Sequence, residues 1–160
     1  MQFTIRDARR GDMAAVHRLI QELADFEKEG AEVEVTVAEL EAAGFGEAPA
    51  FHCFLAERED EILGMALVFW RFSTWKGRVL HLEDLIVTET ARGLGLGNAL
   101  LAEVVKFGHR HGVKRVQWEV LDWNEPAIRF YESKGARVLR DWNVVHLREA
   151  EIHRFVEAVS

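Results

Sequence analysis

A glycine-rich turn between an apolar strand and an amphipathic helix constrains this chain more than any other feature. The strand is His81-Leu-Glu-Asp-Leu-Ile-Val87, the turn is Arg92-Gly-Leu-Gly-Leu-Gly97, and a helical pattern follows from Asn98. Glycines at 93, 95 and 97 leave several backbone N–H groups uncovered at the positive end of the helix dipole. Because such a helix end binds phosphate, and Arg92 adds a positive charge, the turn predicts a site for a phosphorylated ligand.

Three kinds of phosphate-binding turn are alternatives here. A P-loop requires Gly-Lys-Ser/Thr, and the chain has Gly97-Asn98-Ala99 instead, which excludes that class. A dinucleotide fingerprint requires its third glycine where Asn98 stands, and a βαβ unit where a hairpin pattern precedes the turn. A dinucleotide oxidoreductase is therefore a rival that a titration with NADH against coenzyme A separates. A pyrophosphate loop of the Arg-x-x-Gly-x-Gly type fits Arg92, Gly95 and Gly97.

Size and charge restrict the class of protein. We expect a single domain over residues 1–160, since the hydrophobic content of 49% is enough for one core. No apolar run approaches the length of roughly 20 residues that a membrane span needs. The lone Cys53 excludes an internal disulfide and fits a cytoplasmic location. The net charge of −7 argues against nucleic acid as a partner. Thirteen acidic residues lie between Gln21 and Glu61, and either solvate helices or attract a cationic substrate.

Local patterns predict a mixed order of strands and helices in one layered α/β domain. Alternation and β-branched content predict strands over 2–6, 51–58, 62–72, 78–87 and 114–121, with at least one more within 138–147. Helical spacing predicts helices over 12–29, 95–110, 124–134 and 149–158. Thr36-Val-Ala-Glu39 is typical of a capping box, so a further helix is expected to start there and to end before Gly44.

Two motifs together resemble those of the GNAT superfamily of acetyl-CoA-dependent N-acetyltransferases. The first is the strand, Arg-x-x-Gly-x-Gly turn and helix, and the second is Asn124-x-Pro-Ala-x-x-Phe-Tyr131-x-x-x-Gly135, which follows further along the chain. Further segments are similar to the diamine (spermidine/spermine) acetyltransferase subfamily, from about Ile5 to the last helix: Glu22-Leu-Ala24, Phe26-Glu27, Gly44-Phe-Gly-Glu47, His52-Cys53, Ala56-Glu57, Leu82-Glu-Asp-Leu85 and Trp123-Asn-Glu-Pro126.

This resemblance implies the fold, the reaction and the assembly. It implies the GNAT fold, a mixed, mostly antiparallel twisted sheet flanked by helices, with strands that splay apart to admit the cofactor. It implies direct transfer of acetyl from acetyl-CoA to a primary amine of a small polyamine, diamine or lysine-like substrate, and a homodimer. Acetylation of protein lysine or N-terminal amines, and a non-catalytic acyl-CoA sensor, are the alternatives.

The resemblance also implies which residues bind the cofactor. The turn would hold the diphosphate, while the backbone of the preceding strand pairs with the pantetheine arm and the start of the second motif's helix lies near it. The residues concerned are Leu85, Ile86, Val87, Arg92, Gly93, Leu94, Gly95, Leu96, Gly97, Asn98, Asn124, Glu125, Pro126 and Ala127. Asn124 is equally suited to cap that helix.

A second set of residues is expected to bind the substrate and to transfer protons. Tyr131, the chain's single tyrosine, is the expected general acid, because a phenol keeps its proton at pH 7 and can give it to a thiolate. The resemblance implies that Glu83 contacts the substrate amine and relays its proton. It also implies substrate contacts at Phe26, Glu27, Glu83, Asp84, Gln117, Trp118 and Glu119. Strand alternation is expected to send Glu83 and Asp84 to opposite faces. The seven histidines show no metal-ligand spacing, so no metal is expected.

Overall fold

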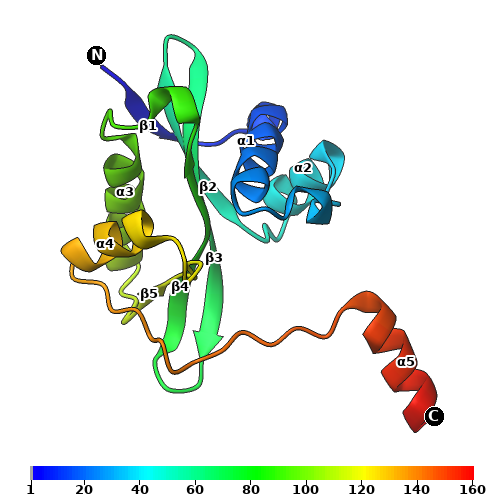
Figure 1. Ribbon diagram of the computed structural model, residues 1–160. Coiled ribbons are helices and arrows are strands. Elements are labelled where there is room, and N and C mark those ends of the chain that lie inside the picture. Colours follow the sequence, from blue (N-terminus) through cyan, green and yellow to red (C-terminus); the bar gives the residue numbers. More distant parts are fainter. Residues whose placement is uncertain (1) are drawn as a thin grey trace. The chain divides into compact units, whose positions relative to one another are not determined.

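The computed structural model describes residues 2–160 and divides the chain into two compact units (Figure 1). The first unit runs to Glu119 and holds the sheet, and the second runs from Val120 to Ser160.

The first unit is built on a five-stranded sheet in the order β1-β2-β3-β4-β5. Its strands are β1 (Thr4–Asp7), β2 (His52–Arg58), β3 (Glu61–Ser73), β4 (Gly77–Val87) and β5 (Val116–Gln117). The first three neighbouring pairs are antiparallel and the pair β4·β5 is parallel. This arrangement confirms the mixed, mostly antiparallel sheet that the resemblance implied.

Helices cover both faces of this sheet (Figure 1). The helices α1 (Met13–Phe26) and α2 (Val37–Phe45) lie on one face, and α3 (Leu96–Arg110) packs on β3 and β4 from the other. Three short 3-10 turns, Arg10–Asp12, Gly30–Glu32 and Glu89–Ala91, join the elements. The core under α1 and α2 is apolar, as burial of these faces requires; its buried members are Met13, Val16, Leu19, Leu40, Cys53, Leu55, Met65, Leu67 and Ile86.

The predicted capping box at the start of α2 is confirmed. The Thr36 hydroxyl accepts a hydrogen bond from the Glu39 N–H at 3.2 Å, and the Glu39 carboxylate accepts one from the Thr36 N–H at 2.7 Å. The expected end of the first helix was three residues too late, since α1 ends at Phe26 and Glu27 is its C-cap.

A β-bulge interrupts β4 at Glu83. Leu67 of β3 pairs with Asp84 and the next residue, Val68, pairs with Leu82, so Glu83 is inserted between them. The bulge adds one residue to β4 and interrupts the simple alternation from which opposite faces were expected for Glu83 and Asp84. Asp84 lies opposite the core residue Leu67 and is partly buried, whereas the side chain of Glu83 is 54% exposed.

The strand β5 is much shorter than the predicted strand over 114–121. It pairs with β4 only at Leu80↔Val116 and His81↔Gln117. From Leu82 onward β4 continues to Val87 without β5 as a neighbour, which leaves that edge of its backbone without a ladder. The fork between the two strands begins directly after His81.

The second unit contains two helices, α4 (Glu125–Ser133) and α5 (Glu149–Val159). Asn124 caps α4, since its side-chain oxygen accepts a hydrogen bond from the Ala127 N–H at 3.4 Å, and Pro126 stands in the first turn. The strand expected within 138–147 was wrong: in the described structure this segment has no strand. Its apolar residues supply the right side-chain pattern, but a strand also needs a neighbour for its backbone hydrogen bonds, and nothing in the pattern provides one.

Candidate active site

Two glycines of the turn before α3 adopt a conformation that L side chains rarely accept. Gly93 has φ +80° and Gly95 has φ +84°, and an added Cβ at either position would meet no heavy atom within 4 Å. Gly97 differs, because its added Cβ would lie 3.8 Å from the Val87 side chain in ordinary contact. The turn thus presents an open main-chain surface, shaped by left-handed residues that favour glycine.

Backbone donors converge at this surface. The first N–H of the helix that reaches an acceptor within it is that of Ala99, which donates to the Gly95 carbonyl at 3.0 Å. The earlier N–H groups at the start of a helix have no partner inside the helix and carry the positive end of its dipole. A diphosphate fits this donor set, since it supplies several anionic acceptors to one helix end.

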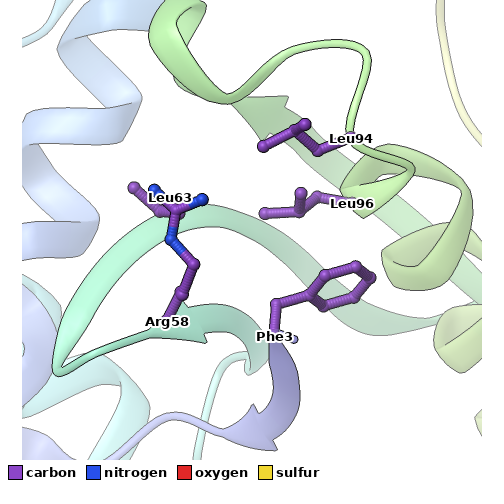
Figure 2. A pocket seen from close by; sticks show the side chains of 5 residues that line it. All are labelled: Phe3, Arg58, Leu63, Leu94 and Leu96. Atoms are coloured by element: carbon purple, nitrogen blue, oxygen red, sulfur yellow. The ribbon is translucent and has the colours of Figure 1, made fainter. Parts of the chain in front are cut away.

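The two leucines of the turn line a small pocket, and only Leu96 is buried. Leu94 and Leu96 alternate with the glycines and face a small pocket of about 130 Å³, which Phe3, Arg58 and Leu63 complete (Figure 2). Leu96 is 2% exposed. Ligand sites are usually above about 300 Å³, so this pocket is too small for a ligand of the usual size.

Arg92 joins the turn to the end of α1. Its Nε donates a hydrogen bond to the Val87 carbonyl at 3.3 Å, and its guanidinium carbon lies 5.4 Å from the centre of the Phe26 ring. This distance is within the range of a cation–π contact. A residue expected to bind cofactor and a residue expected to bind substrate are therefore neighbours.

A second contact links the same two segments one helical turn earlier. Glu22 accepts a hydrogen bond from the Thr88 hydroxyl and one from the Glu89 N–H, each at 3.0 Å. Sequence reasoning assigned Glu22 no role at the site. No local signal could have found this contact, because 66 residues separate Glu22 from Thr88.

The pKa of Asp84 is affected by two other carboxylates, one at the end of α1 and one at the bulge of β4. Burial first, and then the charges of Glu83 and Glu27, raise the pKa of Asp84 to about 6. Burial and the charge of Glu29 raise the pKa of Glu27 as well. The pKa of Glu83 is lowered instead, chiefly by its contact with His81, whose Nε2 lies 3.4 Å from the Glu83 carboxylate.

Repulsion between carboxylates contributes, after burial, to the raised pKa of Asp84. Carboxylates that are held close together repel, and a positive group placed between them removes that repulsion. Of the predicted substrate residues, Glu27 and Glu83 are near enough to Asp84 for their charges to raise its pKa.

His81 is a further residue of this region that the sequence reasoning did not select. Among the buried residues of the described chain, His81 is the one polar residue, and 7% of its surface is exposed. It contacts Gln117 and Glu83. The feature of the sequence that could have indicated His81 is its position two residues before Glu83 on a strand. Once the bulge is known, this spacing places the two side chains near each other.

The remaining predicted residues fall in both units. Leu85, Ile86 and Val87 form the end of β4 beyond the fork, and Gln117, Trp118 and Glu119 lie at and after β5. Asn124, Glu125, Pro126, Ala127 and Tyr131 belong to the cap and body of α4 in the second unit, where the Tyr131 ring contacts Phe130.

Two kinds of feature are absent from residues 2–160. There, no group of three or more histidine, cysteine, aspartate or glutamate side chains is arranged to hold a metal ion. None of the helices found there combines the length and the apolar character needed to cross a membrane.

Comparison with known proteins agrees with this geometry. The model of the acetyltransferase (GNAT) family matches residues 15–136. A thialysine N-epsilon-acetyltransferase of Bos taurus is 37% identical over 145 residues, which are 86% of this chain and 85% of that protein. A spermidine/spermine N(1)-acetyltransferase-like protein of Homo sapiens is 33% identical over 160 residues, which are 94% of this chain and 23% of that protein.

A solved structure supports the fold. An integron cassette protein from the mobile metagenome of V. cholerae superposes with a TM-score of 0.79 at 21% identity, covering 98% of this chain and 99% of that one. The glycine turn, the forked strands and the family match thus agree. The chain belongs to the GNAT acetyltransferase family and is an acetyl-CoA-dependent N-acetyltransferase.

Proposed function

We propose that this enzyme acetylates a primary amine of a small substrate with a second polar or cationic group, either a diamine or polyamine or a lysine-like amino acid. The names of the relatives, thialysine and spermidine/spermine acetyltransferases, support this substrate class. The observation that carries the proposal is the raised pKa of Asp84, which is due first to burial and then to the charges of Glu83 and Glu27.

These carboxylates are proposed to contact the substrate at two positions. Glu27 follows the last residue of α1, while Glu83 and Asp84 lie on β4. We assign the reacting amine to Glu83 and Asp84, and the far group of a two-headed substrate to Glu27. Phe26, Gln117, Trp118 and Glu119 are proposed to complete the substrate contacts.

The cofactor is proposed to bind along the fork and the turn. The backbone N–H groups of residues 93–98 and the Arg92 side chain would hold its diphosphate, and the free edge of Leu85–Val87 would pair with its pantetheine arm. Residues 124–127 are proposed to approach the same arm. Acetyl-CoA supplies the acyl group as an activated thioester.

Two proton transfers remain for the chain's own side chains. An ammonium with a pKa near 10.4 is mostly charged at pH 7, and its deprotonation costs roughly 4–5 kcal/mol. Glu83 is proposed to accept this proton, directly or through water, with Asp84 beside it. Tyr131 is proposed to donate a proton to the departing thiolate from its hydroxyl.

The assembly is proposed to be a homodimer in the cytoplasm. Within the second unit, large apolar side chains of 139–159 are exposed, which favours their burial against a second copy; they are Leu139, Trp142, Val144, Val145, Leu147, Ile152, Phe155, Val156 and Val159. The buried free thiol of Cys53 fits a reducing compartment. Light scattering of the purified protein tests the dimer.

A substrate panel with Glu27→Gln tests the proposed substrate class. Diamines of increasing length, lysine analogues and matched monoamines are compared by thiol release. We expect Glu27→Gln to raise the KM for two-headed amines by about tenfold, the value of one charge-assisted contact, and to leave monoamines nearly unchanged. Glu47→Gln, an equal charge change at an exposed turn residue, is the control. An equal effect of Glu27→Gln on both kinds of amine would contradict the assignment.

A further inference from the structure

His81 is buried on β4 between two polar neighbours. Its Nδ1 lies 3.3 Å from the Gln117 side-chain nitrogen, and its Nε2 lies 3.4 Å from the Glu83 carboxylate. Its ring also contacts the Phe69 ring, with 4.8 Å between centres. Both ring nitrogens are thus engaged, and the remaining surroundings include an aromatic surface.

The contact between Arg115 and Gln117 determines which atom donates and which accepts in the contacts of His81. The Arg115 Nε–H donates to the Gln117 side-chain oxygen at 2.9 Å, and this fixes which end of the amide faces His81. The Gln117 nitrogen therefore donates to His81 Nδ1. A neutral imidazole that accepts at Nδ1 carries its proton at Nε2, so the Nε2–H faces Glu83.

The location of this chain of contacts is specific. His81 and Gln117 form the last registered pair between β4 and β5, directly before the strands separate. Glu83 is the bulge residue two positions further along β4. A bulge turns its side chain away from the regular ladder, so the carboxylate depends on side-chain contacts for its orientation.

We propose that His81, oriented by Gln117 and Arg115, is a positioning residue that holds one oxygen of Glu83 and leaves the other to face the substrate amine. This inference rests on the proposed role of Glu83. His81 itself touches no reacting atom. Its part is to keep the Glu83 carboxylate in a single direction, which converts a mobile bulge side chain into a placed proton acceptor.

Two substitutions of His81 test the donor at Nε2. His81→Gln keeps an amide N–H near the Nε2 position, whereas His81→Leu removes the donor and keeps an apolar side chain of comparable bulk. We expect His81→Leu to lower kcat by about tenfold, the value of one hydrogen bond to a charged group, and His81→Gln to recover most of that loss. The KM for acetyl-CoA should be unchanged in both variants. Equal kcat in His81→Leu and the parent would overturn the proposal, as would an equal loss in both variants.

A double variant separates this inference from the proposed function. Glu83→Gln alone tests the role of Glu83, and no loss of kcat there would refute the proposed function. If Glu83→Gln lowers kcat, His81→Leu should have no further effect in that background, because its influence passes through Glu83. Additive losses would overturn the positioning role while leaving the role of Glu83 in place.

The parent protein provides a test that does not depend on variants folding. Nitrogen-15 NMR of the histidine side chains reports which ring nitrogen is protonated, and His81→Gln identifies the His81 signals. We expect the Nε2–H tautomer, which Gln117→Met should disturb by removing the donor to Nδ1. A proton on Nδ1 of His81 in the parent protein would overturn the proposal.

Discussion

Glu22 on α1 accepts the hydroxyl hydrogen bond of Thr88 at 3.0 Å, across 66 residues of sequence. Thr88 follows the last residue of β4, and the same carboxylate also accepts the N–H of the next residue, Glu89. One helical turn later, the Phe26 ring lies beside Arg92. The segment that leads into the glycine-rich turn is therefore held by the same helix that ends at the proposed substrate residues.

Replacing Glu22 by glutamine should loosen this segment. The amide has a single acceptor oxygen and weaker hydrogen bonds, so one of the two donors loses its partner at a cost of about 1–2 kcal/mol. We expect a melting temperature lower by several degrees and a KM for acetyl-CoA raised several-fold. Differential scanning fluorimetry and initial-rate kinetics measure both.

The control for Glu22→Gln is Glu103→Gln on α3. Glu103 pairs with Arg110 at 3.0 Å in a solvent-exposed contact, and such contacts contribute little. Glu103→Gln should leave both quantities within error of the parent. If Glu22→Gln behaves like Glu103→Gln, the contact with Thr88 has no part in shaping the turn.

Substitutions of the glycines in the turn are predicted to distinguish effects on stability from effects on acetyl-CoA binding. Gly97 has room for a methyl group. Gly97→Ala should therefore leave stability unchanged or raise it by about 0.5–1 kcal/mol, as alanine in a helix does. The methyl group would cover a main-chain donor, and we expect acetyl-CoA affinity to fall about tenfold by calorimetry.

Gly95→Ala is the matched comparison. Gly95 has a φ of +84°, which L side chains rarely adopt. An L residue at this position is strained by about 1 kcal/mol, so this variant should lose stability as well as affinity. An unchanged affinity in Gly97→Ala would place the diphosphate elsewhere.

Asp84 is predicted to make stability fall as pH rises. Its pKa is raised from 3.8 to about 6, so the folded protein binds this proton more tightly than the unfolded chain does. The stability from the protonated carboxyl is complete below about pH 4 and is lost as pH rises through about 6. Asp84→Asn keeps the uncharged form, and should be more stable than the parent at pH 7.5, on the order of 2 kcal/mol, with no difference near pH 4.

Urea unfolding at the two pH values measures this difference, with Glu83→Gln as the comparison. The pKa of Glu83 is lowered, so its carboxylate contributes stability above its ordinary pKa of 4.5 and loses it as pH falls. Glu83→Gln should therefore change stability slightly in the opposite direction at pH 7.5, since this side chain is exposed. Equal unfolding free energies of Asp84→Asn and the parent at pH 7.5 would contradict the prediction.

Removing the hydroxyl of Tyr131 should affect turnover and leave binding intact. Proton donation by a placed side chain contributes about 100-fold or more, so Tyr131→Phe should lower kcat by that order. The affinity for acetyl-CoA should stay as in the parent. Phe130→Leu changes the neighbouring ring on α4 without removing a hydroxyl, and serves as the control for packing. Comparable turnover in Tyr131→Phe and the parent would remove Tyr131 from the role of proton donor.

The local features of the fold were predictable from the sequence. The capping box of Thr36 and Glu39, the cap at Asn124 and the turn before α3 each depend on residues within a few positions of one another. The motif order also indicated the family. Two strand predictions were wrong: the strand within 138–147 and the length of β5. A strand forms only beside a neighbouring strand, and the sequence of one segment does not show which neighbour it will have.

By itself the sequence determined the residue types of the site and the helix-end turn, since both follow from short-range geometry. Only the tertiary structure decided how these groups are arranged. It determines the bulge at Glu83, the burial that raises the pKa of Asp84, the contacts of His81, and the hydrogen bond from Thr88 to Glu22. The reason is that register, burial and charge proximity are properties of segments far apart in the chain, and none of them is encoded in any one segment.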